Sequence, residues 1–144
     1  RWRLGPEIVQ IATRHATAGD VMTRSVASLE ATSSVQDAVA EFQAHPHSTY
    51  PITEHGKVIG LLRRSICYEW LKNRGLTCAD PLSALPLAKP FLIPPETPVP
   101  DLVETLMRSA VSKALVVDAE QKLLGIVTLF DLLKSSRQES GTGF

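Results

Sequence analysis

The sequence predicts an α+β fold that contains two copies of one β-α-β-β-α unit. One observation behind this prediction is an internal repeat: the stretch around Val35 recurs 64 residues later around Val99, and Gly60 recurs 65 residues later as Gly125. A second observation is that apolar residues change from helical spacing to strand-like runs at the same place in each copy. An internal repeat of this kind determines the architecture before single residues are considered.

Each copy is predicted to contain a short strand, a helix, a β-hairpin and a second helix. The first helix of each copy begins beside a capping residue or a proline, and the hairpin strands are separated by polar turns. The predicted elements are, in the first copy, a strand at Ser25–Leu29, a helix at Ser34–Ala44, strands at Thr49–Thr53 and Val58–Leu62 and a helix at Ser65–Asn73, and, in the second copy, a strand at Phe91–Ile93, a helix at Val99–Ala110, strands at Ala114–Asp118 and Leu123–Thr128 and a helix at Leu129–Gln138.

The repeats also define the expected divisions of the chain. Residues 1–17 form an N-terminal arm, with a short helix expected over Pro6–Ala16. Residues 18–75 form the first repeat, a proline-rich connection spans 76–90, and residues 91–135 form the second repeat. The polar residues 136–144 are expected to be a frayed tail.

Composition limits the classes of function. The chain has 144 residues, 44% of them hydrophobic, and 15 basic residues balance 15 acidic ones. A net charge of zero argues against nucleic acid or an acidic membrane as the main partner and favours a small ligand. Cys67 and Cys78 lack the spacing of a zinc site, which favours free thiols in a reducing compartment.

The beginning of the chain bears on its location. The first residue is Arg1, not methionine, so we expect a piece of a longer polypeptide. Arg1-Trp2-Arg3 is either the cytoplasmic flank of a membrane helix or part of a linker. No apolar run reaches the roughly 20 residues that a membrane-spanning helix needs. These features predict a cytoplasmic domain, with a membrane domain upstream as one alternative.

The segment from Gly125 to Asp131 carries the clearest polar signature. Thr128 stands where a strand becomes a helix, and Asp131 follows three residues later. One interpretation is a helix cap that needs no ligand. The other is a ligand site, because a helix N-terminus attracts phosphate and a nearby carboxylate can bind two ribose hydroxyls.

The repeat pattern, together with Ala18–Thr23, Tyr50–Ile52 and Gly125–Asp131, resembles a tandem pair of CBS domains, the Bateman module, over residues 18–134. The resemblance implies two repeats packed about a pseudo-twofold axis, with clefts for adenine nucleotides, and a sensor that is not an enzyme. AMP, ADP or ATP would act as a regulatory ligand and not as a cofactor. The implied ligand contacts are Thr128 and Lys113 on phosphate, Asp131 on ribose, Val26 and Ala27 beneath the base, and His47 and Ser48 at its edge.

The first repeat departs from this pattern. Arg63 and Ile66 occupy the positions that match Thr128 and Asp131, and isoleucine cannot bind ribose. The corresponding cleft is therefore either empty or attractive to an anion through Arg63 and Arg64. No metal site is expected, since His45 and His47 lack a nearby third ligand.

Two functions remain in view. The leading one is a module that senses adenine nucleotide and controls an attached transporter, channel, membrane protease or enzyme. The alternative is a ligand-free structural dimerisation module. In both cases a homodimer is expected, formed by apolar faces on the second helix of each repeat: Ile66, Trp70 and Leu71 in the first, and Leu129, Leu132 and Leu133 in the second.

Overall fold

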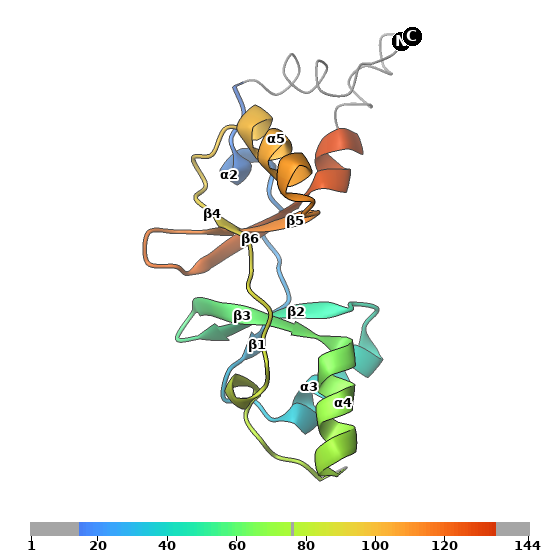
Figure 1. Ribbon diagram of the computed structural model, residues 1–144. Coiled ribbons are helices and arrows are strands. Elements are labelled where there is room, and N and C mark those ends of the chain that lie inside the picture. Colours follow the sequence, from blue (N-terminus) through green and yellow to red (C-terminus); the bar gives the residue numbers. More distant parts are fainter. Residues whose placement is uncertain (1–14, 76, 135–144) are drawn as a thin grey trace. The chain divides into compact units, whose positions relative to one another are not determined.

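The structure, a computed structural model, describes residues 15–75 and 77–134. Within these ranges the chain divides into two compact units (Figure 1). One unit combines the residues up to Val26 with those from Phe91 onward, and the other contains Ala27–Pro90. Residues 15–26, which include the beginning of the predicted first repeat, therefore pack with the second repeat.

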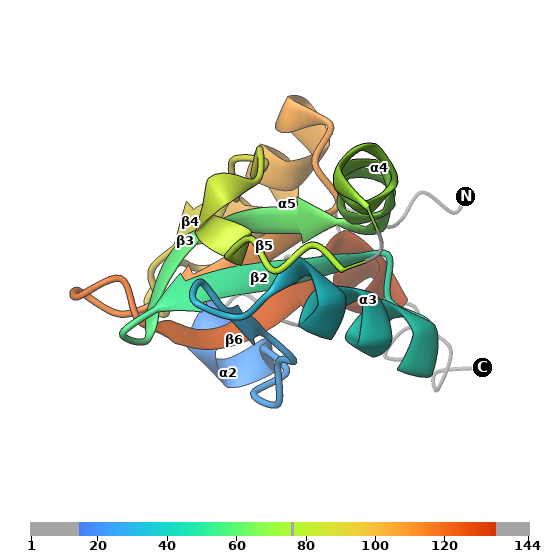
Figure 2. The same cartoon turned by 90° about the horizontal axis from the view of Figure 1, so that it is seen from below.

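The Ala27–Pro90 unit contains one three-stranded sheet covered by helices. The sheet order is β1-β2-β3, in which β1 and β2 are parallel and β2 and β3 are antiparallel. Helices α3 and α4 pack on the same face of this sheet (Figures 1 and 2). The elements are β1 (Leu29–Glu30), α3 (Val35–Ala44), β2 (Thr49–Glu54), β3 (Lys57–Arg63), α4 (Arg64–Arg74) and a short 3-10 helix (Leu82–Ala84).

The other unit repeats this arrangement. Its sheet order is β4-β5-β6, again with a parallel pair followed by an antiparallel pair. Helix α5 and the helix that covers residues 129–134 pack against the core of this unit. The elements are α2 (Ala18–Val21), β4 (Leu92–Ile93), α5 (Val99–Ser109), β5 (Lys113–Val117) and β6 (Leu123–Thr128).

Local sequence explains where these elements begin and end. Ser34 caps α3 because its hydroxyl oxygen accepts a hydrogen bond from the Asp37 N–H at 3.1 Å. The β2–β3 hairpin turns at His55 and Gly56, both of which have positive φ angles of 55° and 82°. Such angles are typical of the two-residue turns that match the twist of a hairpin. Helix α4 ends at Gly75, whose φ is 97°.

An extra chain segment crosses the open edge of each sheet. Thr23 pairs with Ile126 of β6, and Ala88 pairs with Leu61 of β3. Gly125 and Gly60 lie beside these crossings, and a Cβ atom at either would lie within 3 Å of the crossing segment. The repeated glycines are therefore required by close backbone approach.

Each unit buries its own hydrophobic core. The core of the Ala27–Pro90 unit includes Phe42, Tyr50 and Leu62, and the core of the other includes Leu102, Leu106 and Val116. Trp70 and Arg74 of α4 hold the connection that follows: the Trp70 indole N–H donates to the Asp80 carboxylate at 3.1 Å, and Arg74 pairs with the same carboxylate at 3.3 Å.

Most predicted elements are confirmed, but some expectations are wrong or untested. The strand expected at Ser25–Leu29 is only Leu29–Glu30, because residues 24–28 pair with no strand in the structure and pairing with β2 begins at Leu29. The helix expected over Pro6–Ala16 lies mostly outside the described residues, and His15 and Ala16 are not helical. The end of the last predicted helix and the tail 136–144 also lie outside them.

The apolar faces expected on the second helices point inward. Ile66, Trp70 and Leu71 pack against the core of their unit, Leu132 is buried, and Leu129 and Leu133 pack beside it. Apolar residues at helical spacing pack first against their own core, so these faces are less exposed than expected, and the homodimer stays a prediction. Among the described helical residues, the large apolar ones that remain most exposed are Phe130 at 72%, Met107 at 53% and Tyr68 at 39%.

Candidate functional site

The candidate site lies where β6 becomes the final described helix. Thr128 ends β6, and the Thr128 hydroxyl oxygen accepts a hydrogen bond from the Asp131 N–H at 3.0 Å. Lys113, the first residue of β5, is the cross-strand partner of Thr128. The structure thus brings together three of the residues predicted from sequence.

The cap at Thr128 leaves the Asp131 carboxylate free. In a complete capping box, the acidic side chain accepts the N–H of the cap residue. Asp20 does this for Thr17 at 2.9 Å in the same unit. Asp131 is exposed, and its carboxylate has no hydrogen bond or ion pair within the described residues. A carboxylate that binds ribose must have oxygens that can accept hydrogen bonds from the ribose hydroxyls.

Thr128 and Lys113 also retain donors. The Thr128 hydroxyl accepts from Asp131 but can still donate its own proton. The exposed Lys113 ammonium has no ion pair in the described part of the chain, Asp131 included. A hydroxyl and a lysine on adjacent strand ends can contact one anionic group together, and the lysine provides a point charge and not a bidentate fork.

The helix start offers fewer free donors than the sequence predicts. The Leu129 N–H donates to the Ser112 carbonyl at 2.8 Å, and the Asp131 N–H is used by Thr128. Both groups are satisfied inside the unit. Any anion recognised here therefore depends more on side chains than on the helix N-terminus.

The other predicted residues are divided between the two units. Val26 is half-buried in the same unit, three residues beyond the Thr23 crossing of β6. Ala27, His47 and Ser48 belong to the Ala27–Pro90 unit. The His47 ring packs against the Tyr50 ring with centroids 5.4 Å apart, and this contact gives His47 a structural role. Ser48 supplies a carbonyl to the Arg64 N–H at 2.9 Å.

The matching position of the first repeat is built differently. Arg63 precedes α4 and makes no side-chain capping hydrogen bond, whereas Thr128 does. Ile66 is packed against the core and presents no polar atom. The asymmetry predicted between the repeats is therefore present in three dimensions.

Sequence reasoning missed the crossing of β6 by Thr23 and a hollow at the far end of the same sheet. The repeated glycines at 60 and 125 were the sequence signal for the crossing.

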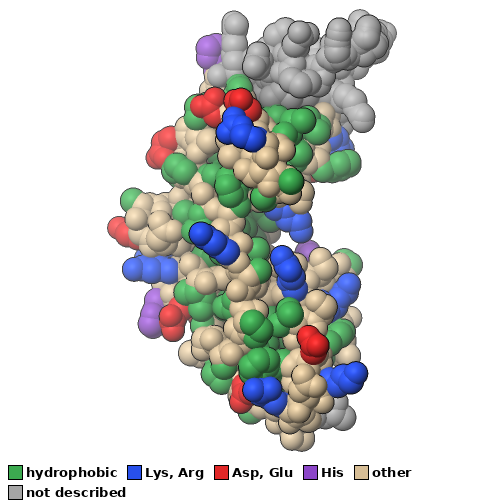
Figure 3. Space-filling view, viewed as in Figure 1, with side chains coloured by type: hydrophobic (Ala, Val, Ile, Leu, Met, Phe, Trp, Pro, Cys, Tyr) green, Lys and Arg blue, Asp and Glu red, His purple; other side chains and the backbone are tan. Residues whose placement is uncertain are grey.

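Charged side chains of both signs are scattered over the face shown in Figure 3. Among the residues that the structure describes, no three His, Cys, Asp or Glu side chains gather as metal ligands. No helix in residues 15–75 and 77–134 has the length and apolar character needed to cross a bilayer.

Comparisons with known proteins agree with this architecture. An uncharacterized protein of Methanocaldococcus jannaschii is 23% identical over 122 residues, which is 84% of this chain but 44% of that protein. The chain thus spans less than half the length of this curated relative.

Two solved structures share the fold. The CBS domain of a bacterial CNNM/CorC family Mg2+ transporter in complex with ATP has a TM-score of 0.71 at 18% identity, covering 92% of this chain and 95% of that one. CBSX2 in complex with AMP has a TM-score of 0.68 at 22% identity, covering 87% and 98%. The CBS domain family matches residues 18–72 and 82–137. The chain therefore belongs to the CBS domain family and carries two CBS domains in tandem.

Proposed function

We propose that this CBS pair is a regulatory module that binds one adenine nucleotide per chain through Thr128, Asp131 and Lys113. The observation that carries the proposal is that the Asp131 carboxylate lies beside a cap that does not use it and has no partner among residues 15–75 and 77–134. An exposed carboxylate can accept hydrogen bonds from two vicinal ribose hydroxyls. Thr128 and Lys113 provide a hydroxyl donor and a positive charge for phosphate.

Similar proteins support the choice of ligand. The related CBS structures named above contain ATP and AMP. One of them comes from a Mg2+ transporter, which supports regulation of an attached transporter, channel, membrane protease or enzyme in the cytoplasm. Val26, Ala27, His47 and Ser48 remain proposed contacts for the base, on the strength of the family resemblance alone.

Titration calorimetry with AMP, ADP and ATP tests the proposal. We expect a stoichiometry of one nucleotide per chain, because the first repeat has Ile66 where the second has Asp131. Adenosine should bind and 2′,3′-dideoxyadenosine should bind much more weakly, since the second lacks the hydroxyls assigned to Asp131. Two equivalent sites, or no heat at millimolar nucleotide, would contradict the proposal.

A second candidate function is a structural dimerisation module that binds no ligand. Exposed Phe130 and Met107 favour it, because large apolar side chains on a helix surface often mark a protein interface. Absence of nucleotide binding together with a stable dimer would favour this alternative.

A further inference from the structure

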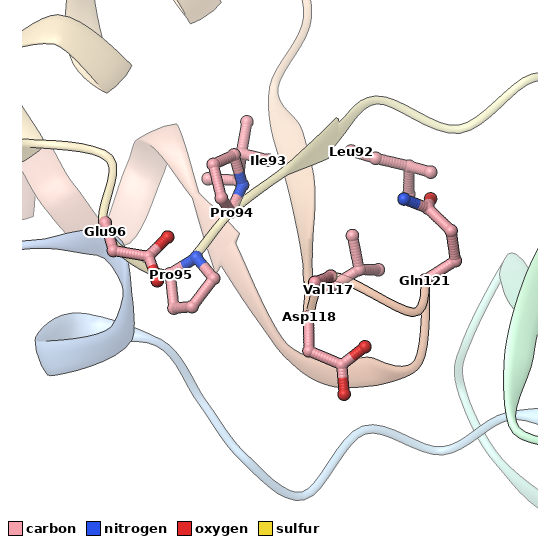
Figure 4. A pocket seen from close by; sticks show the side chains of 9 residues that line it. Leu92, Ile93, Pro94, Pro95, Glu96, Val117, Asp118 and Gln121 are labelled. Atoms are coloured by element: carbon pink, nitrogen blue, oxygen red, sulfur yellow. The ribbon is translucent and has the colours of Figure 1, made fainter.

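A hollow of about 400 Å³ lies at the other end of the β4–β6 sheet from Thr128 (Figure 4). Strand β5 runs from Lys113 at the candidate nucleotide site to Val117 at the hollow, about 13 Å away at the rise of a β-strand. The volume is in the range of small-molecule sites. The lining residues all belong to one unit: Leu92, Ile93, Pro94, Pro95, Glu96, Val117, Asp118, Ala119 and Gln121.

The floor and walls of this pocket are apolar. Ile93 and Val117 are almost fully buried beneath the pocket, and its accessible apolar surface comes from Leu92, Pro94 and Pro95. Prolines hold a fixed φ and donate no N–H, so this wall is stiff and offers no backbone donors. The pocket can therefore accept an apolar body without large rearrangement.

The polar groups at the rim are carboxylates and an amide. Figure 4 shows Glu96 on one side of the pocket and Gln121 on the other. The lining contains no Lys, Arg or His. The Glu96 side chain makes no hydrogen bond or ion pair within the described residues.

One carboxylate oxygen of Asp118 accepts hydrogen bonds within the β5–β6 turn. The Asp118 Oδ1 atom accepts the N–H groups of Glu120 at 2.8 Å and Lys122 at 3.0 Å. These bonds fix the carboxylate, and the second oxygen has no partner in the described part of the chain. The pocket thus joins an apolar floor to two carboxylates with free acceptor capacity, and no cation among the lining residues neutralises them.

We propose that this pocket binds a small organic cation, an ammonium or guanidinium group carried on an apolar body. The cation would interact with Glu96 and Asp118, and the apolar body would cover Leu92, Pro94 and Pro95. A carboxylate binds an ammonium more strongly than a neutral donor. The same carboxylates repel phosphate, so the pocket is distinct in chemistry from the candidate nucleotide site.

The test uses three probes of one shape: 4-phenylbutylammonium, 4-phenylbutanol and 4-phenylbutyrate. Amide signals of Val117–Lys122 should shift in saturable fashion when the cation is titrated into the full chain, with a dissociation constant in the millimolar range, on the order expected for a ligand of this size. The alcohol should bind at least about tenfold more weakly, from the loss of the charged hydrogen bond, and the carboxylate should not bind.

Variants locate the site. Glu96→Gln should weaken binding of the cation at least about tenfold. Asp118→Asn should weaken it while keeping an acceptor oxygen for the turn. Glu120→Gln is the matched control, an exposed acid on the same turn that does not line the pocket, and should change nothing. Equal affinity for the alcohol, no saturable shift, unchanged binding by Glu96→Gln, or displacement of the cation by AMP would overturn the proposal.

Discussion

The Thr128 hydroxyl oxygen accepts the Asp131 N–H at 3.0 Å, so the helix cap uses the backbone of Asp131 and not its carboxylate. Sequence alone offered capping and ligand binding as competing explanations of the same two residues. The structure assigns capping to the Thr128 side chain and the Asp131 backbone. The cap does not use the Asp131 carboxylate, so the two roles can be tested separately.

Asp131→Asn should weaken adenine nucleotide binding by about 1–3 kcal/mol, because a charged acceptor for ribose is lost. The thermal midpoint should hardly change, since the asparagine N–H still donates to Thr128. Titration calorimetry and a thermal melt on the same preparation measure both quantities.

Asp37→Asn provides a matched control for this substitution. Asp37 also follows a capping hydroxyl by three residues, and its N–H donates to Ser34 at 3.1 Å. Nucleotide affinity should therefore be unchanged in Asp37→Asn. A lower melting temperature with unchanged affinity in Asp131→Asn would mean that Asp131 serves only the helix.

The helices and hairpins could be predicted from sequence because their signals are local. Ser34 stands at the start of α3, and apolar spacing identifies its buried face. The packing of residues 18–26 with the second repeat could not be predicted, because backbone contacts between distant residues decide it. The Ala18 N–H donates to the Thr97 carbonyl at 2.8 Å, and the Thr23 N–H donates to the Ile126 carbonyl at 2.9 Å.

The inward orientation of α4 shows a second limit of sequence. Ile66 and Trp70 are four residues apart, which marks an apolar helix face but does not say what covers it. Here the core of the same unit covers that face, and Asp80 accepts the Trp70 indole N–H. The candidate site was predicted more fully, because Thr128 and Asp131 are close in sequence and Lys113 is their strand partner in a predictable hairpin.

Gly125→Ala should destabilise the unit by about 1–3 kcal/mol, as expected for an overpacked site. The added Cβ would lie 2.6 Å from the Met22 sulfur and 2.8 Å from the Thr23 carbonyl oxygen. The methionine side chain can move, but the carbonyl belongs to the backbone segment that crosses β6. Urea denaturation measures the change in free energy of unfolding.

Gly19→Ala is the comparison for this experiment. Its Cβ would approach Pro95 no closer than 3.2 Å, and Gly19 lies in α2, where alanine is the better helix former. The loss of stability should therefore be smaller than for Gly125→Ala. Equal stability of Gly125→Ala and the unchanged protein would show that the crossing is looser than described.

Cys67 should make stability fall at alkaline pH. Burial, with a smaller contribution from the nearby Cys78 thiol, raises the pKa of Cys67 from 9.0 to about 11, and the Cys67 thiol contacts the Val35 carbonyl oxygen at 3.9 Å. Because the folded state holds the proton more tightly than the unfolded chain, this stabilisation is complete below about pH 9 and is lost as pH rises through about 11. The contribution is on the order of 2–3 kcal/mol.

Denaturation of the unchanged protein and of Cys67→Ala across pH 8–11 measures this effect. The variant should be less stable near pH 8, where it leaves a small cavity, and its stability should fall less steeply above about pH 9. The comparison removes the contribution of lysines and tyrosines, which titrate in both proteins. Parallel pH profiles would show that Cys67 does not control the alkaline loss.

The last prediction concerns assembly. We expect a homodimer in solution, with a mass near twice the 15.7 kDa of one chain, and we expect the interface to include Phe130, since 72% of this side chain is exposed. Phe130→Ser should shift the equilibrium toward monomer at micromolar concentrations. Lys134→Gln is the control: the Lys134 ammonium lies 5.9 Å from the Phe130 ring centroid, and its loss should leave the dimer unchanged. Light scattering of the three proteins, with and without AMP, measures the masses. A monomer mass for the unchanged protein in both conditions would refute dimerisation, whereas a dimer unaffected by Phe130→Ser would place the interface elsewhere.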